Sequence, residues 1–172
     1  MKVMAKPHPN KRLPATELNP EQLRVWLAYM RVNLQLTYEM NHQLLAEGDL
    51  SLSDYHVLSK LHQAPDQRLR IAPLAREIGW ERSRASHQVR RMAQRGLIAT
   101  EPVRNDRRGT EVVVTDRGNA AFRDARRGHV ALVRELFFRG LPEDVLLPLA
   151  EALENVYTNI VERGSGFRGA DD

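Results

Sequence analysis

Residues 80–115 read WERSRASHQVRRMAQRGLIATEPVRNDRRGTEVVVT, and this stretch decides the fold. The pattern predicts an Arg-rich helix over Ser83–Arg95, then a strand over Leu97–Val103 and a return strand over Glu111–Thr115. The tip between the strands, residues 105–109, is Asn-Asp-Arg-Arg-Gly. A basic helix can enter the major groove of DNA while a basic hairpin tip reaches the adjacent minor groove. The stretch therefore predicts a winged helix-turn-helix.

Apolar residues at helical spacing predict five further helices around this stretch. The first of these helices covers Pro20–Ala46. The second begins at a cap, Ser51 or Ser53, and ends before Pro65, and the third covers Ile71–Ile78. The last two extend from a cap at Thr115 to Arg139 and over Leu146–Val161. Asn19 and Pro20 suit the N-cap and the first position of the first helix. Gly79 makes the turn before the Arg-rich helix, as a helix-turn-helix requires.

The expected fold class is mainly α with a small β-wing. We expect a winged helix-turn-helix lobe over residues 48–118, with helical dimerisation segments over 20–47 and 119–163. Residues 1–19 read as a flexible arm and residues 164–172 as a flexible tail. The apolar stripes of the end helices exceed what one small domain can cover, so a homodimer that presents two reading helices about a two-fold axis is predicted.

Positive charge is concentrated in the centre of the chain. The net charge is +4, but residues 68–108 hold eleven Arg against four acids, a local +7, which leaves −3 for the remainder. A basic centre between mildly acidic ends is the electrostatic footprint of a polyanion-binding protein. The alternative is a solvated charged face. This alternative is disfavoured because the Arg cluster lies within a recognisable helix pair.

The sequence contains no Cys, which excludes a disulfide, a thiolate metal site and a thiol-based redox sensor. Its apolar runs fall short of the roughly 20 residues that span a bilayer. The first residues, MKVMAKP, lack the apolar centre of a secretory signal. These features predict a soluble cytoplasmic protein without a membrane partner.

The Arg-rich helix has two distinct faces. At about 100° per residue, Ala85, Val89, Met92 and Ala93 fall on one arc and face the core. The outer face carries no acid, although a surface helix of an enzyme usually mixes both charges. Base contacts are predicted for Ser83, Arg84, Ser86 and His87 near the helix start, and phosphate contacts for Arg90, Arg91 and Arg95. For His87 the alternative is a passive surface residue.

The hairpin tip contributes a second set of predicted DNA contacts, Asp106, Arg107 and Arg108. Asp106 can accept from Arg108 across the turn and so fix the direction of the guanidinium. Arg108 would then insert into the narrow, electronegative minor groove. Gly109 permits the tight turn.

With these motifs the chain resembles the MarR family of transcriptional regulators. The matching segments are LAREIG at residues 74–79, residues 83–91, RGLI at 95–98, DRRG at 106–109 and VTDRG at 114–118. The resemblance implies an obligate dimer that binds pseudo-palindromic operators, often as a repressor. It also implies that small, often aromatic, ligands lower the affinity of this dimer for DNA. It assigns Arg108 to the minor groove, Asp106 to its orientation, and Ser86 and His87 to base reading. The family often has Arg or Thr near the position of His87.

A ligand pocket is predicted where the long first helix meets the second helix and the start of the fifth. Seven residues with aromatic rings or polar tips fall there: Trp26, Tyr29, Met30, Tyr38, His42, Tyr55 and His56. Such a mixture suits a small aromatic anion, and the alternative is a core or dimer interface. No cofactor is expected, and the scattered His residues do not form a zinc site.

Two other classes of function are alternatives to a DNA-binding regulator. An enzyme is disfavoured, because the chain has no phosphate-cradling Gly loop, no Gly-x-Ser-x-Gly elbow and no metal-ligand repeat. A winged-helix module that binds protein rather than DNA would not require an acid-free outer face. Salt-insensitive partner binding would favour that module.

Overall fold

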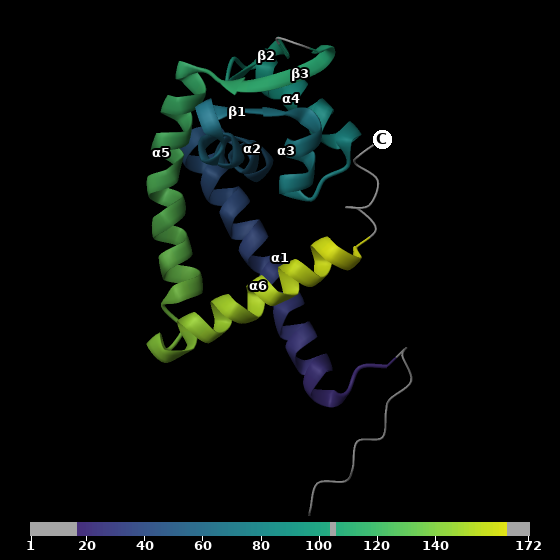
Figure 1. The fold of residues 1–172 in the computed structure, drawn as a ribbon. Helices are drawn as coiled ribbons and strands as arrows, with labels where there is room; N and C mark the ends of the chain where they lie inside the picture. The colour runs from purple at the N-terminus through teal and green to yellow at the C-terminus, as the bar shows by residue number, and fades with distance from the viewer. Residues whose placement is uncertain (1–16, 104–105, 165–172) are drawn as a thin grey trace, which may run out of the picture. The chain divides into compact units, whose positions relative to one another are not determined.

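The computed structural model describes residues 17–103 and 106–164, without the side chains of residues 106–108. Its elements are α1 (Pro20–Gly48), α2 (Leu52–Gln63), η1 (Pro65–Gln67), β1 (Arg68–Arg70), α3 (Ile71–Ile78), α4 (Arg82–Gln94), β2 (Ile98–Val103), β3 (Asp106–Val114), α5 (Asp116–Val133), η2 (Arg134–Phe138), η3 (Glu143–Val145) and α6 (Leu146–Arg163) (Figure 1). The chain separates into two compact units, Met1–Leu36 and Thr37–Asp172. The predicted fold class, mainly α with a small β-wing, is confirmed.

Helix α2 begins at Ser51, the first of the two predicted caps. Its hydroxyl accepts from the backbone N–H of Asp54 at 3.1 Å, and the Asp54 carboxylate accepts from the backbone N–H of Ser51 at 2.9 Å. This reciprocal capping box satisfies two donors that the helix itself leaves unpaired. The first turn of α2 has a further hydrogen bond, because the backbone N–H of Leu52 donates to the side-chain oxygen of Asn41 in α1 at 3.0 Å.

The wing belongs to a three-stranded antiparallel sheet of order β1-β3-β2. Strand β1 was not predicted, and it pairs with β3 in the register Arg68↔Val113. Strand β3 is longer than the predicted Glu111–Thr115 and takes in the backbone of the predicted tip from Asp106 onward. Cross-strand pairing extends it, with Ile98 opposite Val114 and Pro102 opposite Thr110.

The exit from the wing is a close junction between the end of α4 and the start of α5. Thr115 is the N-cap of α5: its hydroxyl accepts from the N–H of Gly118 at 3.1 Å and donates to the carbonyl of Gly96 at 2.7 Å. A Cβ atom at position 118 would overlap the carbonyl oxygen of Leu97. Glycine is therefore required at position 118 by a close backbone approach.

The predicted fifth helix, from Thr115 to Arg139, is interrupted. The α-helical part ends at Val133, and Arg134–Phe138 form a π-helical turn. Such turns accommodate one extra residue within a helix, which an apolar pattern in sequence does not reveal.

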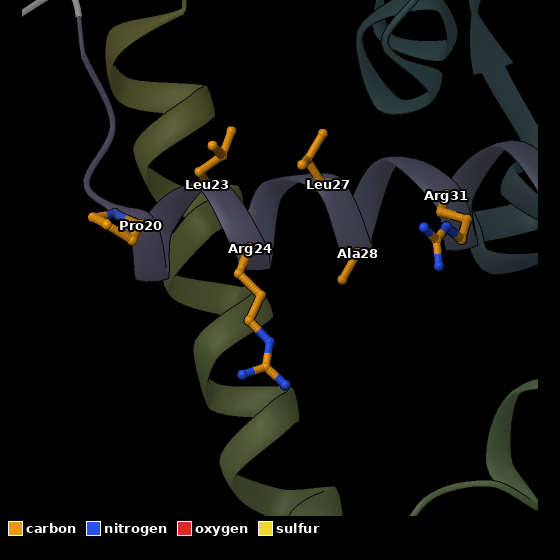
Figure 2. Close-up of a pocket in the computed structure, with 6 residues that line it drawn as sticks. All are labelled: Pro20, Leu23, Arg24, Leu27, Ala28 and Arg31. Carbon is orange, nitrogen blue, oxygen red and sulfur yellow. The ribbon is translucent and has the colours of Figure 1, made fainter.

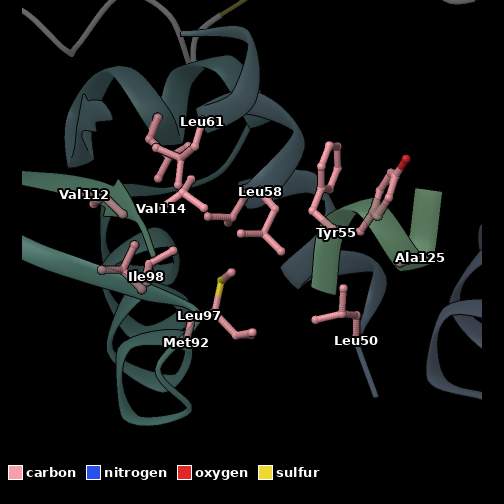
Figure 3. Packing of buried hydrophobic residues seen from close by; sticks show 14 of the residues in the cluster. Leu50, Tyr55, Leu58, Leu61, Met92, Leu97, Ile98, Val112, Val114 and Ala125 are labelled. Carbon is pink, nitrogen blue, oxygen red and sulfur yellow. The ribbon is translucent and has the colours of Figure 1, made fainter. Parts of the chain in front are cut away.

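One apolar core joins α2, α4, the sheet and α5. Figure 3 shows Leu58 and Leu61 of α2 close to Met92 of α4 and to Val112 of β3. These four side chains are fully buried. The core thereby holds the inner face of the Arg-rich helix α4 against the wing that follows it.

The helices at the two ends of the chain differ from this lobe. Helix α6 has no buried residue over Leu146–Arg163. In α1 the buried residues of Pro20–Gly48 are Gln43 and Leu44, near its end. Large apolar side chains such as Trp26, Leu27 and Leu153 are about half exposed.

Candidate DNA interface

The turn between α3 and α4 has the geometry of a helix-turn-helix. Gly79 ends α3 in the left-handed conformation, with φ 71°, where a side chain would be strained. The N–H of Trp80 then donates to the carbonyl of Ala75 at 2.8 Å. These two features reverse the chain, so that α4 starts at Arg82 rather than at the predicted Ser83.

Helix α4 buries the predicted apolar arc and exposes the opposite one. Ala85, Val89 and Met92 are buried, and Ala93 is half-buried. The outward side chains are Ser83, Arg84, His87, Arg90, Arg91 and Gln94. An exposed helical face with three Arg and no acid attracts anions, and an α-helix has the dimensions to enter a major groove.

Two of the predicted base-contact residues have partners within the lobe. The guanidinium carbon of Arg84 lies 4.5 Å from the centre of the Trp80 ring, a cation–π contact. The hydroxyl of Ser86 donates to the carbonyl of Arg82 at 2.8 Å, and Ser86 is half-buried. Arg84 therefore has a restricted direction, and the Ser86 oxygen keeps acceptor capacity.

Arg95, a predicted phosphate contact, has partners within the lobe. Its guanidinium pairs with Asp54 of α2 at 2.8 Å. It also donates to the backbone carbonyl of Asp49, whose carboxylate lies 3.7 Å away. Through these partners Arg95 links the end of α4 to α2, and its contact with phosphate stays a prediction.

The wing is held by cross-strand charges. Arg68 of β1 pairs with Glu101 of β2 at 3.5 Å and with Glu111 of β3 at 3.4 Å. One guanidinium thus bridges all three strands. The predicted wing contacts Asp106, Arg107 and Arg108 concern side chains outside the described part of the chain.

The seven predicted ligand residues have different environments. In the first unit, Trp26 and Tyr29 are exposed with ring centres 5.6 Å apart, and Met30 is half-buried. In the second unit, Tyr38 and His42 are exposed, Tyr55 is buried and His56 is half-buried. Tyr55 and His56 therefore belong to the lobe, and the exposed residues belong to helix surfaces.

Tyr55 lies in an aromatic cluster between α2 and α5 that the sequence did not indicate. Its ring centre is 5.2 Å from Phe122 and 4.3 Å from His129, and His62 stacks on Phe122 at 4.1 Å. The buried Nδ1 of His129 has no hydrogen-bond partner among the described residues. A buried ring nitrogen without a partner is rare in folded proteins, so this position is a candidate for contact with a polar group of a ligand.

The electrostatics of this cluster favour neutral side chains. Burial lowers the pKa of His56, and the positive charges of Arg84 and Lys60 lower it further. Burial also lowers the pKa of His129, with a smaller contribution from His56. Burial raises the pKa of the Tyr55 hydroxyl. Both imidazoles are thereby biased towards the uncharged form.

A shallow hollow lies along the first turns of α1. Figure 2 shows Leu23 and Leu27 on one side of the helix, with Arg24 and Arg31 on another. None of the seven predicted ligand residues is among those that line it. These apolar side chains are exposed in a single chain. Such a surface is better suited to contact with another protein than to enclosing a small ligand.

Over 17–103 and 106–164, no group of three or more His, Cys, Asp or Glu residues is placed to hold a metal ion. Across the same residues, no helix is long and apolar enough to cross a membrane.

A helix-turn-helix with a basic outer helix and a following β-wing defines the class of winged helix-turn-helix DNA-binding proteins. The MarR family model matches residues 50–110. The fold resembles Sco3205, a MarR family transcriptional regulator from Streptomyces coelicolor solved in complex with DNA, at 30% identity and TM-score 0.79, covering 84% of this chain and 91% of that one. AbsC from the same organism, also a MarR family transcriptional regulator, matches at 30% identity and TM-score 0.80, covering 87% and 100%. This chain therefore belongs to the MarR family of transcriptional regulators.

A more distant match shows the fold alone. CouR from Rhodococcus jostii RHA1, solved bound to p-coumaroyl-CoA, is 21% identical with TM-score 0.68, covering 77% of this chain and 90% of that one.

Proposed function

We propose that this chain is a dimeric, sequence-specific DNA-binding repressor whose α4 reads the major groove. The observation that carries the proposal is the acid-free outer face of α4, with Arg84, Arg90 and Arg91 exposed beside His87. Sco3205, a 30% identical relative, was solved in complex with DNA. Ser83, Arg84, Ser86 and His87 are the proposed base contacts, and Arg90 and Arg91 the proposed phosphate contacts.

The wing is the proposed minor-groove contact. Arg107 and Arg108 would supply the positive charge, and Asp106 would orient Arg108. Changing Arg108 to Ala is expected to weaken binding and to reduce the log-log salt slope by about 0.9 if one phosphate contact is lost.

We propose residues 20–47 and 119–163 as the dimerisation region and 48–118 as the DNA-binding lobe. The support is the uncovered apolar surface of the end helices, including Leu23, Leu27, Leu153, Val156 and Ile160. A two-fold dimer presents two α4 helices to two half-sites, which matches a pseudo-palindromic operator. Such a protein acts on DNA in the cytoplasm and needs no enzymatic activity.

We also infer that a small aromatic ligand lowers the DNA affinity. The aromatic walls around the unpaired Nδ1 of His129, with Tyr55 and His56 beside it, support this proposal. CouR, which shares the fold, was solved bound to p-coumaroyl-CoA. Gel shifts with added phenolic acids test the proposal, because an effector should release the DNA at concentrations that leave the protein folded.

The deciding experiment selects duplexes from a random pool with the full chain and titrates the selected sequence at two salt concentrations. Changing Arg91 to Ala should weaken binding to all sequences alike and lower the salt slope by about 0.9. Changing His87 to Ala should instead relax the preference for particular bases, by about 1–3 kcal/mol. Arg123, exposed on α5, is the matched control, and its change to Ala should alter neither quantity.

Failure to enrich any duplex would contradict sequence-specific recognition. Salt-insensitive binding to a protein would favour the alternative, a winged-helix protein-interaction module without a specific DNA target.

A further inference from the structure

A buried carboxylate joins the start of α2 to helix α4. Asp54 is 1% exposed, and its two oxygens accept from four donors. Two of the donors are the backbone N–H and the hydroxyl of Ser51, at 2.9 and 2.8 Å. The other two come from α4 and from the residue that caps its C-terminal end: the Gln88 amide at 2.6 Å and the guanidinium of the C-cap Arg95 at 2.8 Å.

The capping box alone does not account for this arrangement. Capping needs a single oxygen of Asp54 near the helix start and does not require that the carboxylate be buried. Burying a carboxylate costs free energy unless charge and hydrogen bonds compensate it. In this lobe the compensation comes from Gln88 and Arg95, 34 and 41 residues away along the chain.

The two α4 donors are well placed to set the position of that helix. Gln88 and Arg95 are seven residues apart, which is about two helical turns, so both side chains leave the same face. The apolar contacts of Ala85, Val89 and Met92 determine which face of α4 points inward, but the hydrophobic effect behind them is non-directional. Two directional bonds to one fixed carboxylate resist both rotation about the helix axis and sliding along it.

We propose that Asp54 is a positioning residue for DNA recognition: through Gln88 and Arg95 it holds α4 in the rotation that presents His87 and Arg91 to the bases and phosphates. This inference rests on the proposed function. It assigns no DNA contact to Asp54, Gln88 or Arg95 themselves.

Two other roles for these residues predict different results. If Arg95 touched phosphate, its loss would weaken binding to every duplex and lower the salt slope by about 0.9. If Asp54 acted only as a negative charge near DNA, its neutralisation would strengthen binding. A positioning role predicts a weaker preference for the selected duplex at an unchanged salt slope.

The test uses the full chain and two probes: a duplex selected by this protein from a random pool, and a duplex of the same length and composition with scrambled order. The variants are Asp54→Asn, Gln88→Met and Arg95→Met. Each is expected to weaken binding to the selected duplex about tenfold, the scale of one well-formed base contact, and to change binding to the scrambled duplex less than twofold. The double variant of Asp54→Asn with Arg95→Met should be no worse than the single ones, because both remove the same link.

Ser51→Ala is the matched control for stability. It removes the hydroxyl that donates to the same carboxylate oxygen, so α2 loses part of its cap while both α4 links remain. The melting temperature should fall, but the ratio of the two affinities should stay at the wild-type value. Circular dichroism confirms which variants are folded, and half-buried Gln88 keeps the test available if Asp54→Asn does not fold.

Stronger binding by Asp54→Asn, or a parallel loss on both duplexes with Arg95→Met, would overturn the positioning role. An unchanged ratio in folded Gln88→Met would overturn it as well. A wild-type protein that does not prefer any selected duplex would instead refute the proposed function, and the inference with it.

Discussion

The DNA-binding lobe and the end helices use apolar residues in opposite ways. Helix α2 has 12 residues and buries Leu52, Asp54, Tyr55, Val57, Leu58 and Leu61. Helix α6 has 18 residues and buries none, although Leu153, Val156 and Ile160 line one face. The lobe is thus covered by contacts within its own chain, whereas α6 exposes a stripe that a second chain would cover. The difference indicates that stability and DNA affinity can be perturbed separately.

The largest expected effect comes from the stripe on α6. Changing Leu153 to Asp puts a charge into the proposed dimer interface, and the protein should become monomeric by light scattering. A monomer engages one half-site, so operator affinity should fall by at least about a hundredfold. Asn155→Asp adds the same charge to the opposite face of α6 and should leave both measurements unchanged. A dimeric Leu153→Asp variant would place the interface elsewhere.

The next effect tests the lobe at the junction between α4 and α5. Alanine usually stabilises a helix relative to glycine, but Gly118→Ala would force a Cβ against the Leu97 carbonyl. We expect a loss of about 3 kcal/mol, which corresponds to about 10 °C in melting temperature. A Cβ at Gly140 meets nothing within 4 Å, so Gly140→Ala is the control. Equal melting temperatures for the two variants would contradict the close approach.

A smaller effect is expected at the start of α4, the proposed recognition helix. Trp80→Leu removes the cation–π contact that restricts Arg84, worth about 0.5–1 kcal/mol, so operator binding should weaken by about two- to fivefold. In an Arg84→Ala background the same change should have no further effect. A loss that persists without Arg84 would show that Trp80 acts through packing alone.

The smallest effect concerns acid pH and is confined to the lobe. The pKa of His56 and of His129 is lowered in the folded state, so below the unfolded value of about 6.5 the unfolded chain binds more protons. The free energy of unfolding should therefore decline as the pH falls from 6.5 towards the folded pKa values. Urea unfolding at pH 7.5 and 5.5 measures this decline, and His129→Gln should reduce it. An identical decline in the variant would exclude His129 as a source.

The local features of the fold could be predicted from the sequence. Gly79 and Gly96 mark the two ends of α4. The spacing of the apolar residues in α4 distinguishes its buried face from its exposed face. The choice between Ser51 and Ser53 was also decidable, because Ser51 and Asp54 have the spacing of a capping box.

The parts that could not be predicted depend on residues distant in sequence. Strand β1 is three residues, Arg-Leu-Arg, which become a strand only through pairing with β3. The sequence predicts only a phosphate contact for Arg95. Its ion pair with Asp54 is not visible in a helical pattern, because Asp54 lies 41 residues earlier. His129 contacts the ring of Tyr55 only because α5 packs on α2.

The shared carboxylate at Asp54 has a consequence for engineering new operator preferences. Exchange of α4 and its C-cap with those of another regulator would replace Gln88 and Arg95 along with the exposed residues. The buried carboxylate would then lose two of its four donors, including its charge partner. Such a chimaera would need a compensating residue at position 54. Grafts limited to Ser83, His87 and Arg91 leave this linkage intact, so the outward face can be redesigned while its scaffold is kept.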